Sequence, residues 1–196
     1  MISVSVLRNT ALSAALLCGI IGTTHAETAN YEVEPTHTFV TVEVMHFKTS
    51  TLRIRFDDVQ GTIAADAKQN TGSADIKIKA GSINSGTRDF DDHLKSADFF
   101  NAEKYPDITF TGKSFEYKND KLATVGGDLT LLGQTHPVTL KNTNYNCYFQ
   151  PVLKENICGG DFETTIKRSE WGMNWGIDMG IPDEVKILVQ IEAIVK

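Results

Sequence analysis

The stretch FVTVEVMHF, residues 39–47, alternates between two kinds of side chain. Val40, Val42, Val44 and then His46 fall on one face of an extended chain, and the positions between them are mostly polar. Such alternation is typical of a strand with one buried and one wet face, as in antiparallel sheets. It predicts that the His46 ring lies at or near one end of a protein interior.

The same period of two recurs along most of the chain. Long alternating segments cover 73–83, 124–131 and 185–195, and shorter candidates cover 31–33, 51–56, 61–65, 107–117, 137–145 and 160–168. Turn signals separate them at 70–72, 119–120, 133–134 and 159–160. About eight strands with one wet face each indicate an all-β domain, either a closed antiparallel barrel or a two-sheet sandwich.

One helix is expected, at about 88–97. Phe90, Leu94 and Ala97 are spaced to share one helix face, and either Ser85 or Thr87 can serve as the N-cap. Three aspartates occupy the first turns, where the helix dipole favours negative charge: Asp89, Asp91 and Asp92. Because these acids lack a recognised metal-ligand spacing, the helix interpretation is favoured over a metal site, and no metal and no catalytic residue is expected.

The first 26 residues have the pattern of a secretory signal peptide. Arg8 precedes a short apolar run, and Ala26 ends the segment with a small residue. The run is short for a membrane anchor, which needs about 20 apolar residues, and Leu17 disfavours lipidation at Cys18. We expect cleavage after Ala26 and export of one domain, residues 27–196, to the periplasm.

Charge and cysteine content narrow the classes further. The formal net charge of −6 argues against a nucleic-acid partner. Cys147 and Cys158 remain after cleavage, and in an oxidising compartment such a pair is more typical of a disulfide than of a zinc site, which would need further ligands nearby.

Three motifs resemble the YceI-like family of exported bacterial proteins. They are PTHTFVTVEVMHF at 35–47, DDHLKSADFFNAEKYPDITF at 91–110 and GGDLTLLGQTHPVTL at 126–140. The resemblance runs from about Tyr31 to Ala193. It implies a lipocalin-like antiparallel barrel of about eight strands with a helix against it.

The resemblance also implies a function. Family members hold a long polyisoprenoid-type lipid, such as a quinone tail, in an elongated apolar cavity, and no enzymatic activity is established for the family as a whole. We therefore expect a periplasmic carrier with a long apolar lipid as ligand, membrane redox or lipid-handling proteins as partners, and a homodimer as an open alternative. Inward-facing candidates for ligand contact are Val40, Val42, Val44, His46, Phe56, Ile76, Ile78, Phe99, Phe110, Leu129 and Leu131.

Three departures from the family pattern bear on the ligand. Phe90 replaces the usual Arg, Ile54 stands where Gly is common, and the segment 146–160 is an insertion that carries both cysteines. Two alternatives stay open, because inward apolar residues look the same in a filled barrel and in a hollow one. They are a lipid-modifying or hydrolytic enzyme, although no catalytic motif is present, and a filled structural barrel that acts in stress response through protein contacts.

Overall fold

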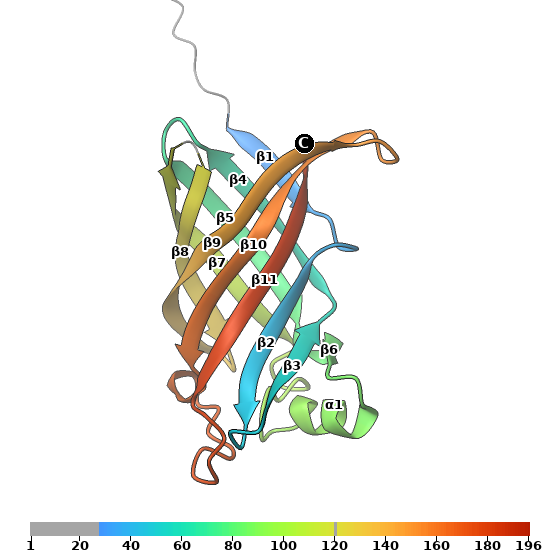
Figure 1. The fold of residues 1–196 in the computed structure, drawn as a ribbon, viewed down its shortest axis with the longest axis vertical. Helices are drawn as coiled ribbons and strands as arrows, with labels where there is room; N and C mark the ends of the chain where they lie inside the picture. The colour runs from blue at the N-terminus through green and yellow to red at the C-terminus, as the bar shows by residue number, and fades with distance from the viewer. Residues whose placement is uncertain (1–27, 120) are drawn as a thin grey trace, which may run out of the picture.

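In the computed structural model, which describes residues 28–119 and 121–196, antiparallel strands close into a barrel (Figure 1). The ring follows the order β1–β4–β5–β7–β8–β9–β10–β11 and returns to β1. Its strands are β1 (Ala29–Val33), β4 (Val59–Asp66), β5 (Thr71–Lys79), β7 (Asp107–Lys118), β8 (Lys121–Leu131), β9 (Gln134–Gln150), β10 (Glu155–Lys167) and β11 (Glu184–Val195). The prediction of an antiparallel barrel is confirmed, whereas the expected signal peptide lies outside the described residues.

Strand β11 closes the barrel by pairing with two strands in succession. Its residues Lys186–Gln190 pair with β2 (Phe39–His46), and its residues Ala193–Val195 pair with β1. Strands β1 and β2 therefore lie one after the other along the same side of β11, with a break between them. Strand β2 continues the sheet to β3 (Ser50–Phe56) and then to the short β6 (Ile83–Asn84), so this side of the barrel flares at its lower end.

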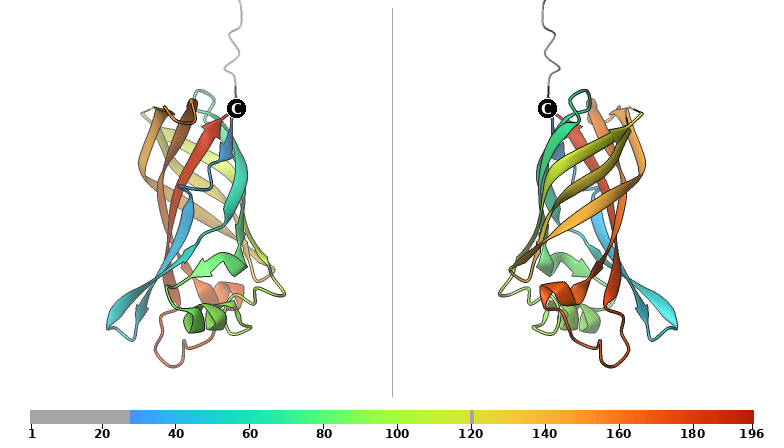
Figure 2. Two further views of the ribbon diagram at one scale, coloured as in Figure 1. Left: turned by 90° about the vertical axis from the view of Figure 1, so that its right-hand side faces the viewer. Right: turned by 90° about the vertical axis from the view of Figure 1, so that its left-hand side faces the viewer.

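Short helical elements cover that flared end. Figure 2 shows α1 (Arg88–Lys95) and the 3₁₀ turn η2 (Arg168–Trp171) at the end opposite the C-terminus, while a further 3₁₀ turn, η1 (Ala80–Ser82), leads into β6. Leu94 is buried beneath α1, and the rings of Phe56 and Phe100 meet edge to face at 5.1 Å. The helix begins after Thr87, as predicted, but it ends at Lys95 because Ser96 is extended, which leaves Ala97 exposed outside it.

Gly159 and Gly160 do not form the predicted turn but lie inside β10. A Cβ atom on Gly159 would stand 2.3 Å from the backbone oxygen of Ile191, and one on Gly160 would stand 2.0 Å from that of Asn144. The glycines are therefore required by the close approach of β10 to its neighbours, next to a register shift at Asp161. A glycine pair has the same sequence signature in a turn and at such a contact.

The Cys147–Cys158 disulfide is confirmed. The two residues are directly opposed in the β9–β10 ladder, with 4.1 Å between their Cα atoms. Beyond them, residues 148–150 and 155–157 pair with each other in a hairpin that projects from the upper end of the barrel (Figure 1). The segment 146–160 thus lengthens two strands and places Phe149 and Val152 in solvent.

Replacing Gly160 by alanine tests the close approach. The added methyl group meets backbone that cannot rotate away, so Gly160→Ala should lower the free energy of unfolding by roughly 1–3 kcal/mol. Gly126→Ala in β8 is the matched control, because its Cβ would meet nothing closer than 3.5 Å. Chemical denaturation measures both variants, and equal stabilities would contradict this account of β10.

Candidate functional site

The barrel encloses an elongated cavity of about 230 Å³. Every strand of the ring contributes to its wall, and the side chains are almost all aliphatic or phenyl groups. The wall follows from the period of two: in β5, for example, Ala74, Ile76 and Ile78 all line the cavity, while Lys77 is exposed on the outer face. The space is far larger than the roughly 10–15 Å³ that one water requires, yet the wall offers water few hydrogen-bonding partners.

The structure brings nearly all of the predicted ligand-contact residues together in this wall. Those that line the cavity are Val40, Val42, Val44, Phe56, Ile76, Ile78, Phe99, Phe110, Leu129 and Leu131. Ile54, one of the departures from the family pattern, also contributes its side chain to the wall. Whether these residues contact a ligand stays a prediction.

His46 does not lie where the alternation placed it. Strand β2 pairs with β11 only as far as Glu43, and beyond that point it pairs only with β3. His46 is therefore at the exposed tip of a two-stranded hairpin, with its ring 4.7 Å from that of Phe47, and it does not line the cavity. The alternation continues past the last barrel contact, and so it overestimated the length of the buried face.

The two ends of the cavity differ in their polar groups. Tyr31, Tyr117 and Tyr145 line the upper end, where burial raises the pKa of each phenol. For Tyr117, burial together with the neighbouring tyrosines and Asp66 raises the pKa to about 12. The phenols therefore stay neutral. Arg168, where η2 begins, lines the opposite end.

An aromatic cluster packs beside Arg168 at the lower end. The His93 ring lies 4.9 Å from Trp175 and 5.1 Å from Phe99, and these contacts join α1 to the loop that follows η2. Trp171 is buried and donates from Nε1 to the backbone oxygen of Leu129 at 3.1 Å. These contacts close the lower end of the barrel.

Two acids of 88–98, Asp91 and Asp98, have local structural roles. Asp91 accepts a hydrogen bond from the backbone N–H of Ser85 at 2.6 Å, and hydrogen bonding by Ser85 lowers the pKa of this carboxyl. His93 pairs with Asp98 at 3.1 Å. Within residues 28–119 and 121–196, no trio of metal-ligating side chains gathers in this stretch.

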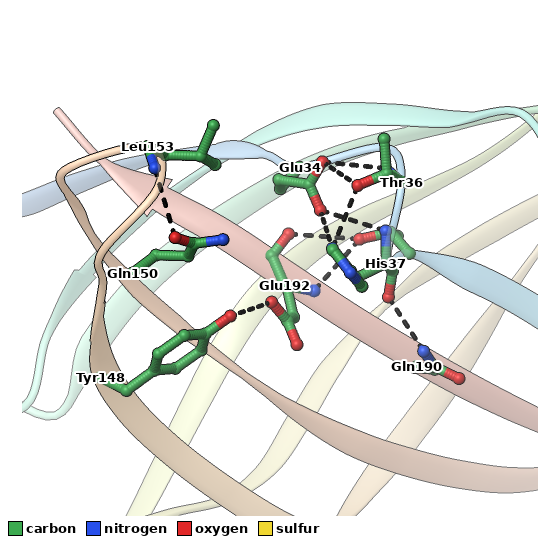
Figure 3. A network of polar contacts seen from close by, with 9 residues as sticks. Glu34, Thr36, His37, Tyr148, Gln150, Leu153, Gln190 and Glu192 are labelled. Carbon is green, nitrogen blue, oxygen red and sulfur yellow. Dashed lines mark hydrogen bonds and ion pairs between the residues drawn. The ribbon is translucent and has the colours of Figure 1, made fainter.

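A second polar network lies at the interruption between β1 and β2 (Figure 3). The buried carboxylate of Glu34 accepts hydrogen bonds from the hydroxyl of Thr36 at 2.6 Å and from Nδ1 of His37 at 2.6 Å. Its neighbour on β11, Glu192, accepts from the hydroxyl of Tyr148 at 2.9 Å, and Thr38 bonds to the Glu192 backbone. The network fixes the chain where β11 changes partner.

The network has the ligand types of a cation site, since atoms of Glu34, His37 and Glu192 lie within 4.8 Å of one another. The side-chain atoms of these residues already form hydrogen bonds within the network, however. The hydrogen bond to Glu34 raises the pKa of His37. Burial raises the pKa of Glu34, but hydrogen bonds from Thr36 and His37 outweigh it, so the net pKa is lowered.

A closed antiparallel barrel with an apolar interior and a helical cover at one end defines a lipocalin-like fold. Residues 31–193 match the family model of the YceI-like domain, and the chain belongs to that family. It is 39% identical over 173 residues to protein YceI of Escherichia coli O157:H7, a match that covers 86% of this chain and 88% of the relative. It is 35% identical over 170 residues to a UPF0312 protein of Pseudomonas putida strain F1, with 85% and 88% covered.

Solved structures share the fold. A Campylobacter jejuni YCEI protein superposes with a TM-score of 0.64 at 27% identity, covering 77% of this chain and 89% of that one. BcnA of Burkholderia cenocepacia gives 0.67 at 22% identity, covering 82% and 98%. A polyisoprenoid-binding domain from Saccharophagus degradans gives 0.63 at 16% identity, covering 85% and 98%. In the part of this chain that the structure describes, no helix has the length and apolar character to cross a membrane.

Sequence reasoning missed the polar residues of the cavity. Arg168 continues the alternation of Phe162, Thr164 and Ile166 along β10, and all four line the cavity. The signal was therefore present, but a cationic residue at the end of an apolar row was not counted as part of it. Tyr117 and Tyr145 also line the cavity and were also missed.

The Glu34–His37 pair predicts a pH-dependent stability. Because the pKa of His37 is raised from 6.5 and that of Glu34 is lowered from 4.5, the pair stabilises fully between pH 4.5 and pH 6.5. The contribution of His37 is lost as pH rises through its folded-state pKa. His37→Ala should thus lower the melting temperature by about 1–3 °C at about pH 5.5 and by less at about pH 8.5. His46→Ala, at an exposed histidine that contacts Phe47, is the control. A deficit that did not change with pH would contradict the prediction.

Proposed function

We propose that this protein is an exported carrier that binds one long apolar lipid of the polyisoprenoid type inside the barrel. The observation that carries the proposal is the cavity itself, which runs from the tyrosines at one end to Arg168 at the other between apolar walls. Such a wall favours hydrocarbon over water, because it satisfies few of water's hydrogen bonds.

The dimensions favour an elongated ligand. Cys158 on β10 and Arg168, one residue beyond the end of that strand, both line the cavity. At about 3.3 Å per residue, this run of strand spans roughly 30 Å, and the tilt of strands in a barrel reduces its length along the axis to roughly 25 Å. A flexible chain of isoprene units suits such a shape better than a compact ring system.

Most of the binding free energy should come from the tail of the ligand. Burial of each CH₂ contributes about 0.8 kcal/mol, whereas one neutral hydrogen bond to a head group contributes about 1 kcal/mol net. A tail of several isoprene units therefore dominates binding, and the head group adjusts selection. The domain from Saccharophagus degradans, described as polyisoprenoid-binding, supports the proposal at the level of fold.

Periplasmic location fits the chemistry of the fold. The Cys147–Cys158 disulfide persists in oxidising compartments and is rare in reducing ones. A carrier there would move an insoluble lipid, with an isoprenoid quinone as one candidate, between membrane redox or lipid-handling proteins. The apolar cavity would shield the tail from water during transfer.

Lipid extraction tests the proposal directly. Protein isolated from the exported fraction of a bacterial host should show, by native mass spectrometry, a bound species that organic solvent removes unaltered. Delipidated protein should then bind isoprenoid quinones with long tails more tightly than those with short tails. Equal affinity for both, or a chemically converted ligand, would contradict a carrier whose affinity rests on the tail.

A charge in the cavity wall should abolish binding. Ile78→Asp would place an unpaired carboxylate among apolar groups, at a cost of several kcal/mol, while Ser73→Asp puts the same group on the exposed outer face of β5. Because Ile78→Asp also threatens folding, Val42→Phe provides an uncharged variant that reduces the cavity volume. Unchanged ligand retention in folded Ile78→Asp and Val42→Phe would show that the ligand does not occupy this cavity.

A further inference from the structure

One charged side chain stands in the cavity wall. Among the described residues that line it, Arg168 alone carries a formal charge. It is 4% exposed and lies one residue beyond β10, where it continues the inward row of that strand. Burial of a charge in an apolar wall is costly unless hydrogen bonds and a partner compensate it. Each of the three guanidinium nitrogens therefore needs a hydrogen-bond partner.

Two of the three nitrogens are used by the loop below the barrel. Nε donates to the backbone oxygen of Pro182 at 3.0 Å, and Nη1 donates to those of Met173 at 3.2 Å and Trp175 at 2.8 Å. Nη2 is buried and has no hydrogen-bond partner. Such orphaned buried donors are rare in native proteins and point to a partner outside the chain, such as water, an ion or a ligand.

The positive charge also lacks a hydrogen-bonded counter-ion. The nearby carboxylate of Asp183 accepts instead from the backbone N–H of Ser169 at 2.8 Å and from its hydroxyl at 2.7 Å. Burial lowers the pKa of Arg168, and the charge of Asp183 offsets only part of this shift. The guanidinium nevertheless stays protonated, because arginine is so strongly basic. Its remaining donor is therefore charge-assisted, and such bonds are about twice as strong as neutral ones.

We propose that Nη2 of Arg168 binds an oxygen of the ligand's head group, so that the lipid lies head-first against the η2 end with its tail toward the tyrosines. The inference rests on the proposed function and adds an orientation and a ligand class. The class comprises long apolar lipids whose head group presents an acceptor oxygen, either a carboxylate or a carbonyl such as that of a quinone. A cationic amine is excluded by like charge, and a plain hydrocarbon leaves the donor unused.

Orientation can be measured with the protein's own fluorescence. The chain has two tryptophans, Trp171 and Trp175, and both lie at the Arg168 end. Stearate that carries a nitroxide beside the carboxylate should quench their emission more strongly than stearate labelled near the methyl end. Equal quenching, or the reverse order, would overturn the head-first orientation.

Selectivity can be measured with one tail and several head groups. Delipidated protein is titrated with a geranylgeranyl chain that ends as a carboxylic acid, an aldehyde, an amine or a hydrocarbon. The acid should bind at least about tenfold more tightly than the hydrocarbon, as expected for a hydrogen bond to a charged donor, with the aldehyde between them and the amine weakest. Equal affinity of acid and hydrocarbon would overturn the anchor.

Variants separate recognition from structure. Arg168 also holds its loop, so the informative readout is the ratio of acid to hydrocarbon affinity rather than either affinity alone. The ratio should fall toward one in Arg168→Met and be preserved in the control Arg53→Met, which removes an exposed guanidinium on β3 that pairs with Glu43 and does not line the cavity. An unchanged ratio in folded Arg168→Met would refute the proposal.

The outcomes also distinguish this inference from the function on which it rests. If none of these lipids binds to the wild-type protein, the carrier function itself is wrong. If all bind alike and neither nitroxide position quenches more, the cavity is a lipid site and only the anchor is wrong. Should Arg168→Met fail to fold, the wild-type titrations and the quenching order still decide between these results.

Discussion

The barrel depends on one strand that serves two partners. Strand β11 pairs first with β2 and then with β1, and the chain between them turns aside at residues 34–38. Glu34, Thr36 and His37 satisfy one another at that break, while Thr38 binds the Glu192 backbone, so the interruption leaves no broken ladder. The same arrangement lets β2 and β3 diverge from the ring, which opens the lower end and creates the need for α1 and η2.

The polar groups of the barrel have different roles at different positions. Outside the barrel they join strands, as at Glu34 and His37, and at the lower end the guanidinium of Arg168 holds three backbone carbonyls of one loop. The interior is left to apolar side chains that surround a cavity instead of filling it. The apolar side chains of the wall pack against one another in one buried cluster. Any ligand that fills the middle would add to stability by mass action.

The period of two in the sequence was sufficient to predict the strands and nearly all of the cavity wall, because alternation is a local property of each strand. It could not place His46, since the length of the buried face depends on where β11 stops pairing with β2. It could not interpret Gly159 and Gly160, whose role is set by the backbone of Asn144 and Ile191. Nor could it show that the barrel is hollow or that Arg168 has an unused donor, because both are properties of three-dimensional packing.

The pairing of β1 with β11 also sets an order of events. These are the first and last strands of the described chain, and Lys196 still donates from its backbone to the oxygen of Asn30 at 2.8 Å. Chains are made from the N-terminus, so neither β1 nor β2 can pair with this neighbour until β11 has been made. Closure therefore waits until β11 has been made. A chain that was exported across a membrane during synthesis would therefore remain an open, unclosed sheet until β11 had crossed.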